Sequence, residues 1–415
     1  MSGVGGKGIP RLQDLSYIEV AVAQVAAGAP FEQIRRGLVS RAAEIDRAGD
    51  LDGSFDERRW EQTRSDAKKY VHNTVDVLKE LMRLGWVEKS ILPAGPSSAY
   101  AHAETTYTLT LSGREWADLA ASDRRAAYNA LVGELIAVHP HFEGFLRTVG
   151  GRPESTGNHF TIPVMRFDPA RHTTHDAFLN DFIKFVCTAA ASNSLGWQAP
   201  SHVIEEGIRT YVARIQARAT AREKAVTRKQ FMNTCEEAIS RVAFTAAGCP
   251  MDYVTLELLR RWTRFLGLAT FSYYAPGPPA LRLWATAAVG GRGKTVRIDR
   301  RVGHQVRHQV LQELWGVWQE ERSEAAGGMY LPVWRLRAAV CWKQRINDDE
   351  FDLAIVEALA GKHGDLGIDI HLDQASLRAT PGSTRPLIIP TNSGLRRVFN
   401  VINLTQRADT TTSLG

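Results

Sequence analysis

One stretch, from Asp66 to Leu119, constrains the fold more than any other, because it carries a helix signal, a hairpin signal and a second helix signal in turn. Apolar residues recur at helical spacing from Ala67 to Met82. Gly85 then supplies the kind of residue that commonly closes a helix. The stretch therefore begins with an amphipathic helix that ends just before a strand-like run.

That strand-like run covers residues 86–91, and a second one with alternating side chains covers 106–111. Between them lies a tip at 93–98 rich in proline, glycine and serine, which is typical of a hairpin connection. Ser112 and Glu115 have the spacing of a capping box, so a second helix is predicted to begin there.

The succession LxxLGWVEK…YTLTLSGREWADLA resembles the C-terminal half of a winged-helix DNA-binding domain. The resemblance implies that the helix before the hairpin is the third helix of such a domain and the hairpin its wing. It is more specific for the fold than for the ligand, because winged helices also bind proteins.

The dipeptide Leu-Gly followed by an apolar residue occurs four times, with its glycine at Gly85, Gly196, Gly267 and Gly367. We expect each glycine to close a helix in the left-handed conformation and the next residue to start a strand. Two strand-like runs separated by a proline-rich tip follow Gly267, and the pattern recurs after Gly367 at 368–372 and 386–389. No convincing hairpin follows Gly196.

These repeated patterns predict a mainly α protein with small β-hairpins, an α+β fold of tandem winged-helix domains. A chain of 415 residues has room for two to four domains of about 100–200 residues each. The predicted division is winged-helix domain 1 at 1–125, a helical or degenerate winged-helix domain with a basic helix at 126–230, winged-helix domain 3 at 231–300, a C-terminal winged-helix-like domain at 301–405 and a flexible tail at 406–415.

The composition of the chain indicates in which cellular compartment the protein works and which class of partner it can bind. No apolar run approaches the roughly 20 residues of a membrane span, and the start of the chain is too polar for a signal peptide. Four cysteines lie far apart with no CxxC pair, which indicates a reduced, cytoplasmic protein with buried thiols. A net charge of +6 permits a polyanionic partner without demanding one.

Two predicted third helices carry polar and basic residues of the kind that a recognition helix presents to phosphates and base edges. In the first domain these are Arg64, Ser65, Lys68, Lys69, His72 and Asn73, and in the third domain they are Arg260, Arg261 and Arg264. Each residue taken singly could be an ordinary surface side chain. As two clusters they favour double-stranded DNA.

A basic stripe is predicted in the second domain, where Arg214, Arg218 and Arg222 recur at i, i+4 and i+8. Cations on one helix face can neutralise phosphates and release counterions, which gives sequence-independent affinity. The alternative is a solvated helix face.

The segment Gly290–Thr295 superficially resembles a phosphate-binding P-loop, but Ala288 stands where that loop needs its first glycine. The residues after it form a strand-like run, so no helix N-terminus would meet a phosphate. We therefore reject nucleotide binding there and predict a flexible basic loop in which Arg292 and Lys294 touch the DNA backbone.

The last domain differs from the others because its predicted third helix is acidic. Asn347 has the character of an N-cap, and three acidic residues follow it. An acidic helix would repel phosphate, and the helix before it is rich in leucine, valine and tryptophan. We expect this domain to dock a protein partner or the body of the chain itself.

The motifs of common enzymes are missing from the sequence. There is no G-x-S-x-G, no HExxH and no glutamate followed two residues later by lysine. We therefore expect no catalytic residues, no cofactor and no metal, and no activity as an enzyme.

Three functions remain open. The first is a non-catalytic double-stranded DNA-binding protein, which resembles in architecture the DNA-reading subunits of bacterial restriction and phage-defence complexes and could equally serve genome maintenance. The second is an adaptor whose winged helices hold other proteins in a complex. The third is a restriction nuclease with a divergent active site.

Overall fold

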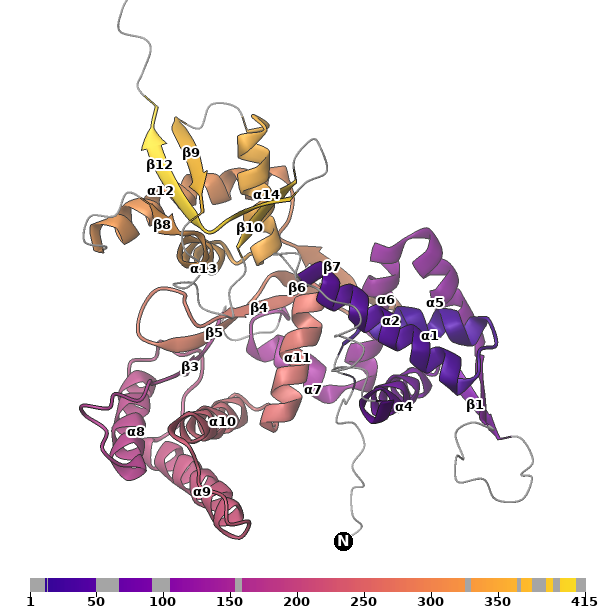
Figure 1. Ribbon diagram of the computed structural model, residues 1–415, viewed down its shortest axis with the longest axis horizontal. Helices are drawn as coiled ribbons and strands as arrows, with labels where there is room; N and C mark the ends of the chain where they lie inside the picture. The colour runs from indigo at the N-terminus through magenta and orange to yellow at the C-terminus, as the bar shows by residue number, and fades with distance from the viewer. Residues whose placement is uncertain are drawn as a thin grey trace, which may run out of the picture. The chain divides into compact units, whose positions relative to one another are not determined.

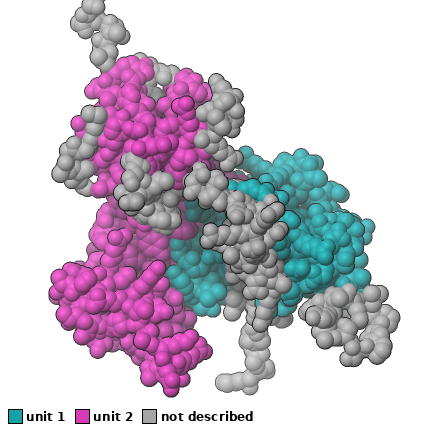
Figure 2. All heavy atoms as spheres, viewed as in Figure 1, with its two compact units in different colours: residues 1–146, 251–266, 289–298 teal, residues 147–250, 267–288, 299–415 magenta. Residues whose placement is uncertain are grey.

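A computed structural model describes residues 12, 14–49, 67–91, 105–153, 159–324, 330–363, 367–374, 386–390 and 396–407. The chain is mainly helical with small antiparallel sheets, which confirms the predicted α+β class. It divides into two compact units, coloured separately in Figure 2. Unit 1 comprises residues 1–146, 251–266 and 289–298, and unit 2 comprises residues 147–250, 267–288 and 299–415.

Each unit is thus assembled from segments that are far apart in the sequence. This division differs from the consecutive domains predicted above, and the tandem winged-helix organisation stays a prediction.

Unit 1 begins with helices followed by a hairpin, as the sequence predicts (Figure 1). The elements are α1 (Ser16–Ala26), α2 (Phe31–Gly49), α4 (Ala67–Arg83), β1 (Val87–Ile91) and β2 (Thr105–Leu109). The helices pack on one another through fully buried side chains such as Ile18, Leu38 and Leu81. Strands β1 and β2 pair antiparallel, with Val87 opposite Leu109. The predicted tip at 93–98 lies outside the described residues.

Helix α5 (Leu111–Ser122) begins earlier than predicted. Its N-cap is Thr110, whose side chain accepts a hydrogen bond of 3.1 Å from the Gly113 amide. The predicted start at Ser112 is therefore wrong. The Thr110 hydroxyl also donates to the Gly85 carbonyl at 2.7 Å, so the threonine that ends the hairpin also caps the helix.

The four Leu-Gly sites all have a glycine with positive φ, but only two of them close a helix. Gly85 follows α4, and Gly267 follows α11 (Tyr253–Phe265). Gly196 lies in a bend, and Gly367 directly precedes a strand. The predicted helix ends at these last two sites are wrong, because Ser192 and Ala360 already cap the helices before them.

The rest of unit 1 is helical, apart from a short segment carried on a small hairpin. Its elements are α6 (Arg124–Val138), α7 (Pro140–Thr148) and α11, together with the 3-10 turn Gly293–Thr295, which lies between β6 (Ala287–Gly290) and β7 (Arg297–Arg300). Trp262 of α11 is fully buried, and its indole N–H donates to the Leu12 carbonyl at 2.8 Å. The turn approaches Gly133 of α6 so closely that a Cβ there would lie 2.1 Å from the Gly293 oxygen.

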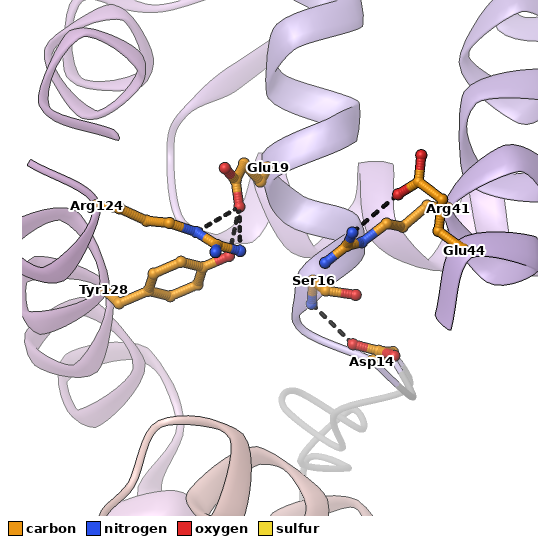
Figure 3. A network of polar contacts seen from close by, with 7 residues as sticks. All are labelled: Asp14, Ser16, Glu19, Arg41, Glu44, Arg124 and Tyr128. Carbon is orange, nitrogen blue, oxygen red and sulfur yellow. Dashed lines mark hydrogen bonds and ion pairs between the residues drawn. The ribbon is translucent and has the colours of Figure 1, made fainter. Parts of the chain in front are cut away.

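A polar network joins α1 to α6 within unit 1 (Figure 3). One carboxylate oxygen of Glu19 accepts hydrogen bonds from Arg124 at 2.9 and 3.1 Å and from the Tyr128 hydroxyl at 3.0 Å. Burial of the phenol, followed in importance by the neighbouring Glu19 charge, raises the pKa of Tyr128 to about 12. The network therefore favours the neutral phenol.

The Tyr128 phenol should consequently ionise at a higher pH than an ordinary tyrosine does. Its contribution to stability is fully present below the ordinary pKa of 10.0 and is lost as the pH rises through the folded value of about 12. Subtracting the alkaline absorbance titration of Tyr128→Phe from that of the wild type isolates this group. A difference curve centred at the ordinary pKa would show that neither burial nor Glu19 holds the phenol neutral.

Unit 2 contains a three-stranded antiparallel sheet in the order β3-β5-β4. Strands β4 (Ala269–Ser272) and β5 (Ala280–Ala285) form the hairpin predicted after Gly267, whereas β3 (Phe160–Pro163) comes from much earlier in the chain. Phe160 and Phe271 both lie opposite Leu283 of the central strand. Three helices follow β3 in the sequence, α8 (His175–Ala191), α9 (Ser201–Thr220) and α10 (Arg228–Ala246).

The C-terminal part of unit 2 joins three helices to two small sheets (Figure 1). The elements are α12 (His304–Glu324), β8 (Leu331–Pro332), α13 (Val333–Gln344), α14 (Asp348–Leu359), β9 (Ile368–Asp373), β10 (Leu387–Pro390), β11 (Arg396–Phe399) and β12 (Val401–Gln406). The hairpin predicted between 368–372 and 386–389 is wrong, because β9 pairs with β12 and β10 pairs with β11. Ile402 and Leu404 of β12 are buried in the same core as Ile368 of β9, and Ile402 lies opposite Leu372 in the paired strands.

The apolar residues of the C-terminal part are buried in the core of unit 2. Leu314, Trp318 and Leu336 share one core with Trp284 of β5. The acidic helix α14 is capped by Asn347, as predicted. Its carboxylates contact arginines of the neighbouring helices, Glu350 and Glu357 with Arg307 at 3.0 and 2.7 Å and Asp352 with Arg337 at 2.7 Å. This part therefore packs against the body of its own unit, one of the two outcomes expected from the sequence.

Three of the four cysteines, Cys235, Cys249 and Cys341, are buried, and all four thiols are free. Burial raises the pKa of Cys235 to about 12, which keeps its thiol neutral. In the described part of the chain, every helix is too short or too polar to cross a membrane.

Candidate nucleic-acid interface

Helices α9 and α10 lie side by side as a helical hairpin in unit 2 (Figure 1). On α9, Ile204, Ile208 and Val212 recur every four residues and are buried, so this helix turns one apolar face inward. A capping box formed by Thr227 and Gln230 starts α10. The opposite face of α9 and the connection to α10 are left to solvent.

The predicted stripe lies on that exposed side. Arg214 and Arg218 are exposed on α9, but Arg222 lies in the turn after the helix has ended at Thr220. The helical part of the stripe is therefore shorter than the sequence predicts. Its third arginine, Arg222, is carried by the turn and not by the helix. The Arg214 guanidinium stands over the Tyr211 ring at 4.9 Å, which orients its charge.

Further cations extend the stripe around the turn. We define the α9–α10 basic surface as six exposed residues, Arg214, Arg218, Arg222, Lys224, Arg228 and Lys229. Among the described residues, none of the six forms an ion pair with a carboxylate. Residues 209–229 hold seven cations and one anion, a net charge of +6 that equals the net charge of the whole chain.

Three other predicted DNA contacts are engaged with carboxylates inside unit 1. Arg260 is only 4% exposed and pairs with Glu257 one turn away. In the segment that resembles a P-loop, Arg292 pairs with Glu143 and Lys294 with Glu115 at 3.3 Å. The strand β7 that follows agrees with the rejection of a P-loop. The predicted flexible loop is instead tied to α5 and α7, and its charges are largely compensated.

The remaining predicted contacts lie on two helices of unit 1. On α11, Arg261 and Arg264 are exposed. On α4, His72 is exposed and Asn73 is half-buried, and Lys68 and Lys69 lie in the first turn, where the side chains are outside the described residues. Arg64 and Ser65 also lie outside the described residues.

Lys224, Arg228 and Lys229 follow the three arginines of the stripe closely in the sequence, although only the three arginines are predicted there as DNA contacts. The signal was present as a run of cations with a single glutamate, Glu223. The sequence does not show that Arg260, Arg292 and Lys294 pair with carboxylates in the fold, whereas the six cations of the α9–α10 basic surface have no such partner among the described residues.

Comparison with protein-family models, with curated proteins and with solved structures finds no match for this chain.

Proposed function

We propose that this protein binds double-stranded DNA through the α9–α10 basic surface, without catalysis. The observation that carries the proposal is that six neighbouring exposed cations have no carboxylate partner in the described part of the chain. The positive charges of such a cluster repel one another. A bound polyanion neutralises them and releases the counterions condensed on its own phosphates. Side chains four residues apart on a helix lie about 6 Å from one another, so they can follow a backbone of closely spaced phosphates.

Helix α4 with its hairpin β1–β2 supports a second contact on unit 1. A helix followed at once by an antiparallel hairpin is the arrangement in which a winged-helix domain presents its recognition helix. Exposed His72 at the N-terminal half of α4 is suitably placed for such a contact. A role as the DNA-recognition component of a defence or genome-maintenance complex stays a prediction.

The test compares two triple variants that each remove three exposed positive charges. Arg214→Ala, Arg218→Ala and Arg222→Ala together should reduce the slope of log K against log salt by roughly three, because each lost phosphate contact contributes about 0.9. The matched control replaces Arg124, Arg171 and Arg407 by alanine; these arginines are 55%, 69% and 53% exposed but already paired with carboxylates. The measurement is a salt titration of binding to a random duplex.

Equal slopes for the two triple variants and the wild type would show that the basic surface does not contact DNA. Equal reductions in both variants would mean that net charge alone drives the association. Cleavage of the duplex in the presence of a divalent metal would instead identify a nuclease.

A further inference from the structure

Unit 2 contains a cavity of about 720 Å³ that the basic surface does not use. It is lined by the segment that follows β3, by the β4–β5 connection and by parts of α8, α12 and α13. Four aromatic residues contribute to its wall, Phe185, Tyr273, Tyr274 and Trp334. This volume lies in the range of sites that hold small molecules and cofactors.

Two of the aromatic rings form a corner. The centroids of Tyr274 and Trp334 are 4.8 Å apart and their planes are inclined by 65°. Both residues are only half-buried, so ring surface is left for a ligand. Tyr273 beside them is fixed by a hydrogen bond of 2.5 Å from its hydroxyl to Glu236. A planar heterocycle can stack on one ring of this corner and meet the other edge-on.

The β4–β5 connection is held as a rigid wall by a buried arginine. Arg282 is 6% exposed, and its guanidinium donates to the carbonyls of Ala275 at 3.0 Å and Pro278 at 2.9 Å. Burial lowers the pKa of Arg282. These two hydrogen bonds clamp the turn that carries Pro276 and Gly277 into the cavity wall.

The charges of the cavity are compensated except at one residue. Glu321 pairs with Arg335, and Glu320 pairs with Lys343 at 2.9 Å. Arg166 is exposed, and among the described residues it has no carboxylate partner. It also lines a smaller adjoining cavity of about 160 Å³, so it stands where the two spaces meet.

The backbone around Arg166 is anchored on both sides. The Val164 amide donates to the Pro279 carbonyl at 3.1 Å, and the Phe167 amide donates to the sulfur of Met232 at 3.2 Å. A guanidinium on such a fixed segment loses less freedom when it binds an anion. Arginine recognises phosphate with paired N–H donors, which suits this position.

We propose that this cavity binds a nucleotide, with the base at the corner of Tyr274 and Trp334 and the phosphate at Arg166. The volume accommodates base, sugar and phosphate together, and the Glu320 carboxylate can accept hydrogen bonds from amino or hydroxyl groups of the ligand. The same chemistry is offered by a free mononucleotide and by an unstacked nucleotide of a nucleic acid strand. The proposal does not depend on DNA binding by the α9–α10 basic surface.

The test measures equilibrium binding of AMP, GMP, CMP and UMP, with adenosine and inorganic phosphate as partial ligands. Trp334→Ala should weaken nucleotide binding by about tenfold or more, which is the usual effect of losing one stacking ring. Arg166→Gln should weaken AMP binding to a similar degree but leave adenosine binding unchanged. Because Arg166 is exposed, this variant folds even if Trp334→Ala does not. Arg171→Gln, outside the cavity, is the matched control and should bind AMP as the wild type does.

Absence of AMP binding to the wild-type protein at millimolar concentration would overturn the proposal. So would wild-type affinity for AMP in the Arg166→Gln variant. Competition by a short single-stranded oligonucleotide would identify the nucleic acid strand as the source, and its absence would identify free nucleotides. The variant with Arg214, Arg218 and Arg222 replaced should keep its AMP affinity, which separates this site from the proposed DNA surface.

Discussion

Replacing Trp284 by alanine should lower the free energy of unfolding of unit 2 by about 3–5 kcal/mol, the usual cost of truncating a buried tryptophan. Trp284 is 1% exposed and belongs to both the β3-β5-β4 sheet and the core of the C-terminal helices. Its indole N–H donates to the Ile346 carbonyl at 3.1 Å, and its ring meets Trp342 edge-on. Truncation therefore opens a cavity and leaves a carbonyl without its donor.

Denaturant unfolding measures this change, and Trp284→Phe is the control. Phenylalanine keeps most of the apolar volume and loses the N–H, so we expect a smaller loss of about 1–3 kcal/mol. Equal stability of the wild type and the alanine variant would contradict the shared core. In that case residues 299–415 would not belong to the same cooperative unit as the sheet.

Replacing Gly133 by alanine should destabilise unit 1 by about 1–3 kcal/mol, although glycine to alanine in a helix ordinarily stabilises by up to about 1 kcal/mol. The new methyl group would lie 2.1 Å from the Gly293 carbonyl oxygen, which is backbone and cannot simply rotate away. The turn 293–295 must then move from α6, and the ion pairs of Arg292 and Lys294 are strained with it.

Gly316 provides the matched control, because it lies in the middle of α12 and an added Cβ would meet nothing within 4 Å. Gly316→Ala should therefore be neutral or stabilising. Thermal unfolding gives the sign for both variants, and limited trypsin digestion after Arg292 and Lys294 reports release of the turn. A stabilising Gly133→Ala would show that the turn does not rest on α6.

The elements that sequence patterns predicted well are those specified by neighbours along the chain. Helix α4 and the hairpin β1–β2 match the predicted ranges closely, since helical and alternating periodicity are local signals. The start of α5 was misplaced because Thr110 and Ser112 are both acceptable caps. Thr110 is distinguished from Ser112 by a tertiary contact, because the Thr110 hydroxyl donates a hydrogen bond to the Gly85 carbonyl.

Long-range strand pairing could not be predicted in the same way. Strand β3 pairs with β5, which lies more than a hundred residues later in the sequence. No local pattern predicts Leu283 as the partner of Phe160. The C-terminal strands failed for the same reason, because β12 contributes Ile402 and Leu404 to a core assembled from several helices. Both pairings join strands that other elements separate in the sequence, and local patterns do not encode such partners.

The sequence shows which residues are basic, but it does not show which of them are free to bind a ligand. A basic residue is visible in the sequence, but its ion pair is not, because Glu143 and Arg292 are 149 positions apart. Only the fold separates the engaged cations of unit 1 from the α9–α10 basic surface. The cavity beside Trp334 was not foreseen at all, since its walls come from segments scattered between Val164 and Arg335.

The interleaving of the two units bears on how the protein is made. Residues 1–146 leave the ribosome first, yet their unit also needs α11 and residues 289–298. Trp262 donates its hydrogen bond to a carbonyl 250 residues earlier. At about 5–20 residues per second, translation takes roughly 8 to 30 s to pass from residue 146 to residue 298. During that interval the first helices expose the surface that α11 later covers, and any expressed fragment that stops at residue 146 carries the same exposed surface permanently.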